Sequence, residues 1–234
     1  MKNFIGLFIV FIIHFCASCQ SKNKVINDCY GTNLTKLEQQ NVEKDIPVDK
    51  KSGKSILLNY QRWIDSKIGL CSIENGFSDF QIRMSYEFAH NDTIQYIVLT
   101  KSGDNYSAQF YKVLLKLNER KDSVVSVVKS VVQKKPLSSW ADFSDSLMSL
   151  QIMTLPDYNA IDNYPMSMDA NTLTIQTATK NVYRIYQYLG PEGAQFTNKQ
   201  AKLLMQILKL IEKEFSIKWL YQNEKLLNRR LLPQ

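Results

Sequence analysis

The fold of this chain is decided by the stretch Phe80-Gln81-Ile82-Arg83-Met84-Ser85-Tyr86-Glu87-Phe88, in which apolar and polar residues alternate strictly. A period of two residues is typical of a β-strand with one face in the core and the other in water. We therefore predict a strand whose even-numbered residues are buried and whose odd-numbered residues face solvent.

Further strands are expected on both sides of a helical region. Short polar turns connect the first strand to three more runs rich in β-branched, aromatic and other apolar residues, which predicts an antiparallel meander. Two later runs flank a four-residue turn and predict a hairpin. The predicted strands after the first are Thr93–Lys101, Tyr106–Leu117, Val124–Val132, Thr172–Thr177 and Val182–Leu189.

Helical periodicity marks three other segments. Ile56–Ile68 predicts a short amphipathic helix, and Ser139–Leu150 predicts another, capped by Ser138 or Ser139. A capping box at Thr197–Gln200 opens a long helix, whose apolar stripe runs from Ala201 to Phe215. The predicted class is α+β: an antiparallel sheet, made of a meander and a C-terminal hairpin, packed by the long C-terminal helix and the shorter helices.

The N-terminus has the form of an export signal. Lys2 precedes an apolar run from Phe4 to Phe15, which is shorter than the roughly 20 residues that a membrane-spanning helix needs. A short apolar segment behind one basic residue favours a cleaved signal over a membrane anchor.

The residues after this run resemble the lipobox of bacterial lipoproteins. Ala17 and Ser18 stand directly before Cys19, and the resemblance implies that Cys19 takes a diacylglyceryl group and becomes the first mature residue. Cys16 occupies the position that is usually aliphatic, so cleavage by an ordinary signal peptidase is the alternative. Residues 20–24 lack the acidic cluster that resembles a signal for export to the cell surface, and they lack the Asp after the cysteine that resembles a signal for retention in the inner membrane. We therefore expect a lipid-anchored envelope protein that faces the periplasm.

The rest of the chain suits one domain. We predict a signal peptide at 1–18, a flexible tether at 19–55, where polar and charged residues dominate, and a single globular domain at 56–234. Cys29 and Cys71 are expected to form a disulfide in an oxidising envelope, the alternative being that they are buried free thiols.

Composition argues against several classes of function. The net charge of +7 is spread along the chain and does not form the basic cluster that nucleic-acid binding requires. Gly53-Lys54-Ser55 has Val48 in place of the first glycine of a P-loop. The two histidines are His14, in the signal, and His90, in a turn. We predict no nucleic-acid partner, no cofactor, no metal site and no catalytic residue.

Two segments carry the candidate binding residues. In the strand predicted at 182–189, alternation places Arg184, Tyr186 and Tyr188 on one face, a combination that suits a sugar, a peptide or an acidic partner. The alternative is that these aromatic side chains belong to the core. The loop at 155–171 carries the other candidates, which are Asp157, Tyr158, Asp162 and Tyr164.

From Trp140 through Phe215 the chain resembles uncharacterised small lipoproteins of Bacteroidota. The resemblance is carried by a helix headed by Trp140, by Leu155-Pro156-Asp157, by the Tyr-Arg-x-Tyr-x-Tyr segment and by the long helix. It implies no particular activity. We expect a non-catalytic binding or interaction module, such as an inhibitor or immunity-like factor, with an unknown protein or glycan partner. The alternatives are a periplasmic hydrolase of glycan or peptide and a structural component of the envelope.

Overall fold

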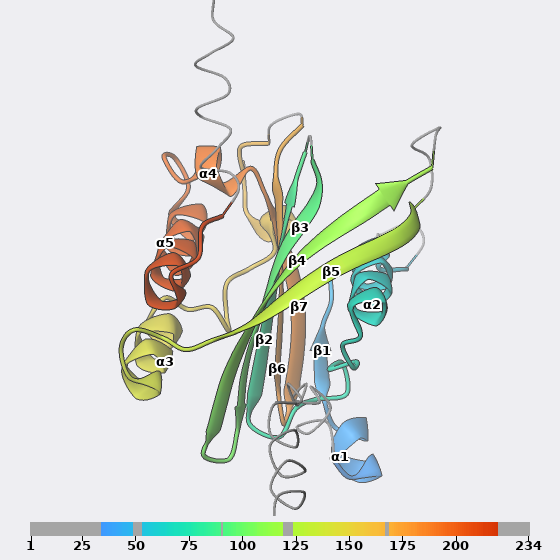
Figure 1. The fold of residues 1–234 in the computed structure, drawn as a ribbon, viewed down its shortest axis with the longest axis vertical. Coiled ribbons are helices and arrows are strands. Elements are labelled where there is room, and N and C mark those ends of the chain that lie inside the picture. Colours follow the sequence, from blue (N-terminus) through green and yellow to red (C-terminus); the bar gives the residue numbers. More distant parts are fainter. Residues whose placement is uncertain (1–33, 49–52, 90, 119–123, 167–168, 220–234) are drawn as a thin grey trace, which may run out of the picture.

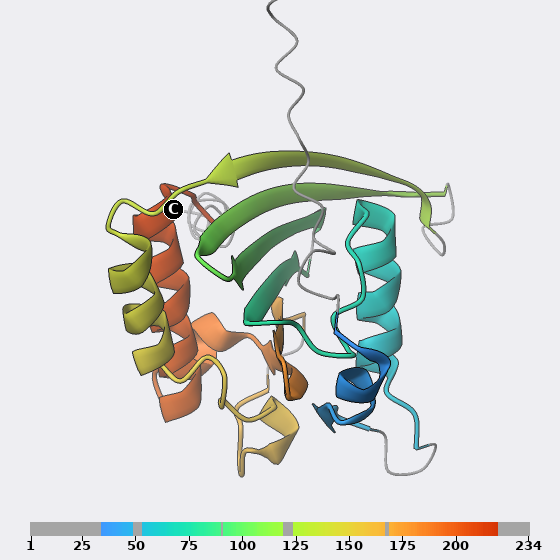
Figure 2. The ribbon, with the colours of Figure 1, turned by 90° about the horizontal axis from the view of Figure 1, so that it is seen from below.

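A seven-stranded sheet with helices on both faces forms the body of the protein (Figures 1 and 2). The computed structural model describes residues 34–48, 53–89, 91–118, 124–166 and 169–219. The strands are β1 (Glu43–Asp45), β2 (Phe80–Phe88), β3 (Asn91–Ser102), β4 (Asn105–Leu117), β5 (Val124–Lys134), β6 (Thr172–Thr179) and β7 (Val182–Leu189). The helices are α1 (Lys36–Gln40), α2 (Ile56–Ile68), α3 (Trp140–Ser149), α4 (Pro191–Ala194) and α5 (Lys199–Phe215), with a short 3₁₀ helix, η2 (Tyr158–Ala160).

The strand order is β1-β7-β6-β2-β3-β4-β5. The predicted α+β class, the meander β2–β5 and the hairpin β6–β7 are confirmed. The hairpin returns to the other side of β2, so that Met84 lies between Ile97 of β3 and Ile175 of β6. The first strand of the meander therefore lies in the interior of the sheet.

One face of the sheet carries the largest apolar core. The buried stripe of α5 runs from Ala201 to Phe215 as predicted, and Phe143 and Leu147 of α3 join it. The predicted capping box at Thr197 is wrong by one residue. The side chain of Asn198 accepts the hydrogen bond from the Ala201 amide at 2.8 Å. Asn caps a helix as well as Thr does, so the helix begins one residue later.

The opposite face of the sheet is covered by α2 (Figure 1). The prediction that the odd-numbered residues of β2 face solvent is therefore wrong: Gln81, Arg83 and Ser85 are buried. The buried face of α2 also does not consist of apolar residues alone. Ile56 is 77% exposed, whereas Asp65 is buried. On this face of β2, Arg83 and Ser85 are buried because they contact polar side chains of α2.

The prediction of a flexible tether at 19–55 is wrong for residues 34–48. Thr35 and Glu38 form a capping box that begins α1, and β1 pairs in parallel with residues 182–184 of β7. Glu38 also forms an ion pair with Lys180 at 2.7 Å. The hydrogen bond from Lys180, together with those from Thr35, lowers the pKa of Glu38 to about 2. Residues 53–55 of the predicted tether lead into α2, with Ser55 as its N-cap. Residues 19–33 and 49–52 lie outside the described residues.

The predicted signal peptide, 1–18, and Cys19 also lie outside the described residues. Within the described part of the chain, no helix has the length and apolar character that a bilayer crossing requires.

Candidate functional site

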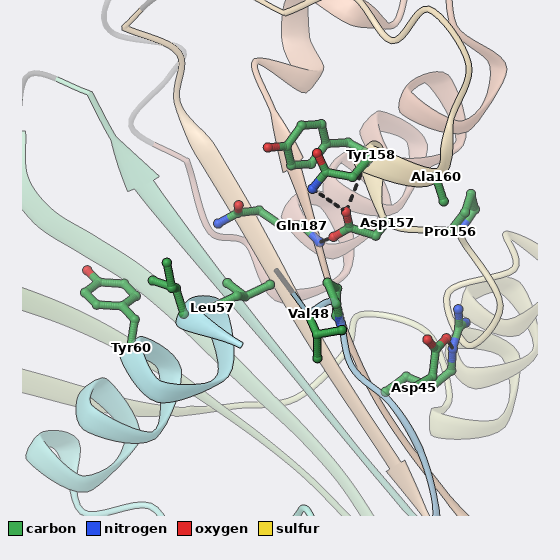
Figure 3. A pocket seen from close by; sticks show the side chains of 13 residues that line it. Asp45, Val48, Leu57, Tyr60, Pro156, Asp157, Tyr158, Ala160 and Gln187 are labelled. Atoms are coloured by element: carbon green, nitrogen blue, oxygen red, sulfur yellow. Dashed lines mark hydrogen bonds and ion pairs between the residues drawn. The ribbon is translucent and has the colours of Figure 1, made fainter. Parts of the chain in front are cut away.

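A groove of about 1070 Å³ opens at the β1–β7 edge of the sheet. Figure 3 shows Leu57 and Tyr60 projecting from α2 on one side, Asp157 and Tyr158 on the other, and Gln187 between them. The lining residues are Asp45, Pro47, Val48, Ile56, Leu57, Tyr60, Pro156, Asp157, Tyr158, Asn159, Ala160, Arg184 and Gln187.

The groove exists because β1 is short. It pairs only with residues 182–184, so the second half of β7 has no strand neighbour on that side among the described residues. Ser55 then begins α2 by accepting a hydrogen bond from the Leu58 amide at 3.1 Å. This start places Ile56 and Leu57 at one rim of the groove. The segment around η2 forms the other rim.

Side chains of β7 hold the loop at 152–155 against the sheet. The Arg184 guanidinium donates to the carbonyl oxygens of Met153, at 2.5 Å, and Leu155, at 3.1 Å. The Tyr186 hydroxyl donates to the carbonyl of Ile152. Two of the predicted binding residues therefore fix the loop that forms the groove wall.

Two residues of the loop cap the free edge of β7 in return. The Asp157 carboxylate accepts a hydrogen bond from the Gln187 amide at 2.9 Å, and the Tyr164 hydroxyl donates to the Leu189 carbonyl at 2.9 Å. Exposed strand edges are prone to pair with other chains, and loops that cover them prevent this. Asp157 and Tyr164 do so here.

The structure brings together three of the predicted binding residues. Asp157, Tyr158 and Arg184 all line the groove. Tyr186 and Tyr188 are 1% and 0% exposed in the core beneath α5 and offer no surface to a ligand. Tyr164 is also buried, and Asp162 is exposed but does not line the groove.

The charged groups of the groove are already engaged within the fold. Arg184 forms an ion pair with Asp45 at 2.7 Å. The Asp157 carboxylate accepts two hydrogen bonds from Asn159 in addition to the one from Gln187. The groove therefore offers a ligand mainly apolar, aromatic and amide groups.

Tyr60 connects the groove wall to the sheet. Its hydroxyl donates to the Glu87 carboxylate at 2.8 Å. Burial raises the pKa of Glu87, and the hydrogen bond from Tyr60 opposes this rise. Burial, with the adjacent Glu87 charge, raises the pKa of Tyr60. The pair fixes the aromatic ring at the groove rim through a partly buried hydrogen bond.

A polar cluster lies between α2 and the sheet. Asp65 is at its centre and accepts hydrogen bonds from Gln61 at 3.0 Å, Tyr96 at 2.6 Å, Arg83 at 2.8 Å and Gln176 at 2.9 Å. Burial, followed by the Asp65 charge, raises the pKa of the Tyr96 hydroxyl well above its ordinary value. All four lone-pair positions of the carboxylate are used, so the cluster is a structural connection between helix and sheet.

Sequence reasoning missed the groove residues Asp45, Ile56, Tyr60 and Gln187. Ile56 and Tyr60 belong to the segment predicted only as an amphipathic helix, and Asp45 belongs to the predicted tether. The buried cluster did have a signal, because Gln61 and Asp65 lie four residues apart on the same helix face as Leu58, Ile64 and Ile68.

The remaining predicted site residues are the cysteines. Cys71 is disulfide-bonded. Cys29 lies outside the described residues, and its pairing with Cys71 stays a prediction. His90 also lies outside them. Among the residues that the structure describes, no three His, Cys, Asp or Glu side chains gather as metal ligands would.

No protein-family model matches this chain, and neither the curated proteins nor the solved structures contain a significant match.

Proposed function

We propose that this chain is a lipid-anchored protein of the cell envelope whose β1–β7 groove binds an extended segment of a partner protein. The observation that carries the proposal is the chemical character of the groove. Val48 and Ile56 are 57% and 77% exposed at its rim, while its charged groups already form an ion pair and hydrogen bonds within the protein. Surfaces of this kind bind by burying apolar side chains, with a few polar groups for orientation.

The residues that line the groove also favour a polypeptide over a glycan as the ligand. Pro47, Pro156 and Leu57 add aliphatic surface around the two tyrosines. A sugar ring needs polar groups directed at its hydroxyls, whereas here Gln187 and Asn159 are the uncharged amides of the lining. Aliphatic side chains of a peptide fit this lining better.

The alternative of a hydrolase is less well supported. General acid–base chemistry needs carboxylates within reach of a substrate. Asp45 and Asp157 both line the groove, but Arg184 binds the first and three hydrogen bonds occupy the second. Neither is arranged as a free acid or base.

The binding function is tested by purifying the protein from membranes of its own organism in mild detergent. We expect a stoichiometric protein partner with the natural chain, and a loss of at least about tenfold with Ile56→Glu, because a charge on the rim opposes burial of apolar side chains. Phe196→Glu is the matched control. Phe196 is 80% exposed just after α4 and does not line the groove, and its replacement should leave the partner bound. Equal recovery with both variants, or no partner at all, contradicts the proposal.

The anchor has a separate test. We expect Cys19→Ala to move the protein from the membrane fraction to the soluble fraction, because stable anchoring depends on acyl chains on that cysteine. The control is Cys16→Leu, which restores the usual lipobox residue and should leave the protein in the membrane fraction. Persistence of Cys19→Ala in the membrane fraction shows that the lipid is not the anchor.

A further inference from the structure

The strand β5 forms the edge of the sheet that lies farthest from the groove in the strand order (Figure 2). It is 11 residues long and pairs with β4 along one side. No strand among the described residues pairs with its other side. Along that side, alternate backbone N–H and C=O groups point outward and can accept another strand. This edge is longer and less covered than the β7 edge.

Apolar side chains are exposed on both faces of β5. Val128 and Val132 are 48% and 53% exposed on the face that also carries Leu114 of β4. Val131, which pairs with Tyr111, is 45% exposed on the opposite face. An added strand would cover apolar surface on both sides of the sheet, in addition to forming backbone hydrogen bonds.

The two strands at this edge, β4 and β5, carry charge of one sign. Residues 105–118 and 124–136 carry five lysines and no Asp or Glu. Lys129 is held by the carbonyl of Ile68 at the end of α2. The other four are Lys112, Lys116, Lys134 and Lys135. None of them forms an ion pair with another described residue. An acidic partner would compensate these charges.

We propose that β5 accepts an extended, acidic segment of a partner protein as an additional strand, in which apolar residues alternate with Asp or Glu. The backbone edge supplies the hydrogen bonds, the exposed valines contact the apolar residues, and the lysines select for negative charge. This surface is separate from the β1–β7 groove, and the proposal does not depend on the function of that groove.

The charge pattern favours an acidic strand over two other occupants. A second copy paired through β5 would bring two sets of lysines together, and like charges across a strand pair are destabilising. A lipid surface would attract the lysines, but it would leave the outward N–H and C=O groups of β5 without partners in an apolar environment. Both remain distinguishable outcomes of the experiment.

The test uses the full chain in mild detergent and a soluble peptide of alternating Val and Glu residues as the probe. We expect saturable binding that is abolished when the alternate peptide nitrogens are methylated, because methylation removes the N–H donors. We expect the double variant Lys112→Glu/Lys116→Glu to weaken binding about tenfold, since two attractions become repulsions. The matched control is Lys199→Glu/Lys202→Glu, on the exposed side of α5, which should bind as the natural chain does.

Several results would overturn the proposal. These are equal binding of a peptide of alternating Val and Lys, undiminished binding of the methylated peptide, and equal loss in both double variants. Sedimentation that shows a dimer dissociated by Lys112→Glu/Lys116→Glu would assign the edge to a second copy. Binding to vesicles rich in anionic lipid, lost in the same variant and without binding of the Val-Glu peptide, would assign it to a membrane surface.

Discussion

Replacing Arg83 by Met is expected to lower the free energy of unfolding by about 3–5 kcal/mol, because it leaves a buried carboxylate without its cation. Arg83 is 1% exposed and binds Asp65 at 2.8 Å. It also donates to the side chain of Gln81 at 2.7 Å and to the carbonyl of Cys71 at 2.6 Å. The substitution keeps most of the side-chain volume but leaves these acceptors without that donor, so the loss should appear as a lower midpoint in urea denaturation.

The control is Arg62→Met. Arg62 lies on α2 and is the other arginine whose ion pair involves this helix. The Arg62 side chain is 53% exposed and binds Glu74. Only the arginine of this pair is exposed, since the Glu74 side chain is 10% exposed, and we expect a loss that is clearly smaller than that of Arg83→Met. Adding Asp65→Asn to Arg83→Met should recover part of the stability, because it removes the uncompensated charge. Equal losses for Arg83→Met and Arg62→Met would show that the buried cluster does not connect α2 to the sheet.

The strands and the longer helices were predictable because local periodicity determines them. Ile56–Ile68 begins after Ser55 and ends at Gly69, which adopts the left-handed conformation, and both signals are visible in the sequence. The alternation in β2 likewise identified a strand. It did not identify what covers the second face, because Gln81, Arg83 and Ser85 have the same period whether they meet water or the polar side of a helix.

The candidate site was less predictable because it depends on contacts between distant segments. Arg184 and Tyr186 were selected for their side-chain chemistry, but the loop at 152–155 occupies both. The groove itself requires β1 to pair with β7. A strand of three residues with the sequence Glu-Lys-Asp carries no apolar alternation, and only its partner makes it a strand.

Replacing Trp219 by Ala is expected to lower the free energy of unfolding by about 3–5 kcal/mol, the range typical of deleting a large buried aromatic side chain. Trp219 is 0% exposed, and its ring lies 5.9 Å from Tyr86 and 6.0 Å from Phe110, between centroids, in edge-to-face contacts. The indole N–H donates to the Leu208 carbonyl at 3.3 Å. The residue thus attaches the chain beyond α5 to both the helix and the sheet.

The comparison with Trp219→Phe and Trp63→Ala separates the causes of this loss. Phe keeps much of the buried ring and loses the hydrogen bond to Leu208, so its cost should be about 1–2 kcal/mol. Trp63 is only partly buried on α2, where it stacks on Tyr60, and its deletion removes less buried surface and should cost less than that of Trp219. Urea denaturation followed by far-ultraviolet circular dichroism measures all three without depending on tryptophan emission. If Trp219→Ala costs no more than Trp63→Ala, the chain beyond α5 does not contribute to the core, and the contacts with Tyr86 and Phe110 are not stabilising.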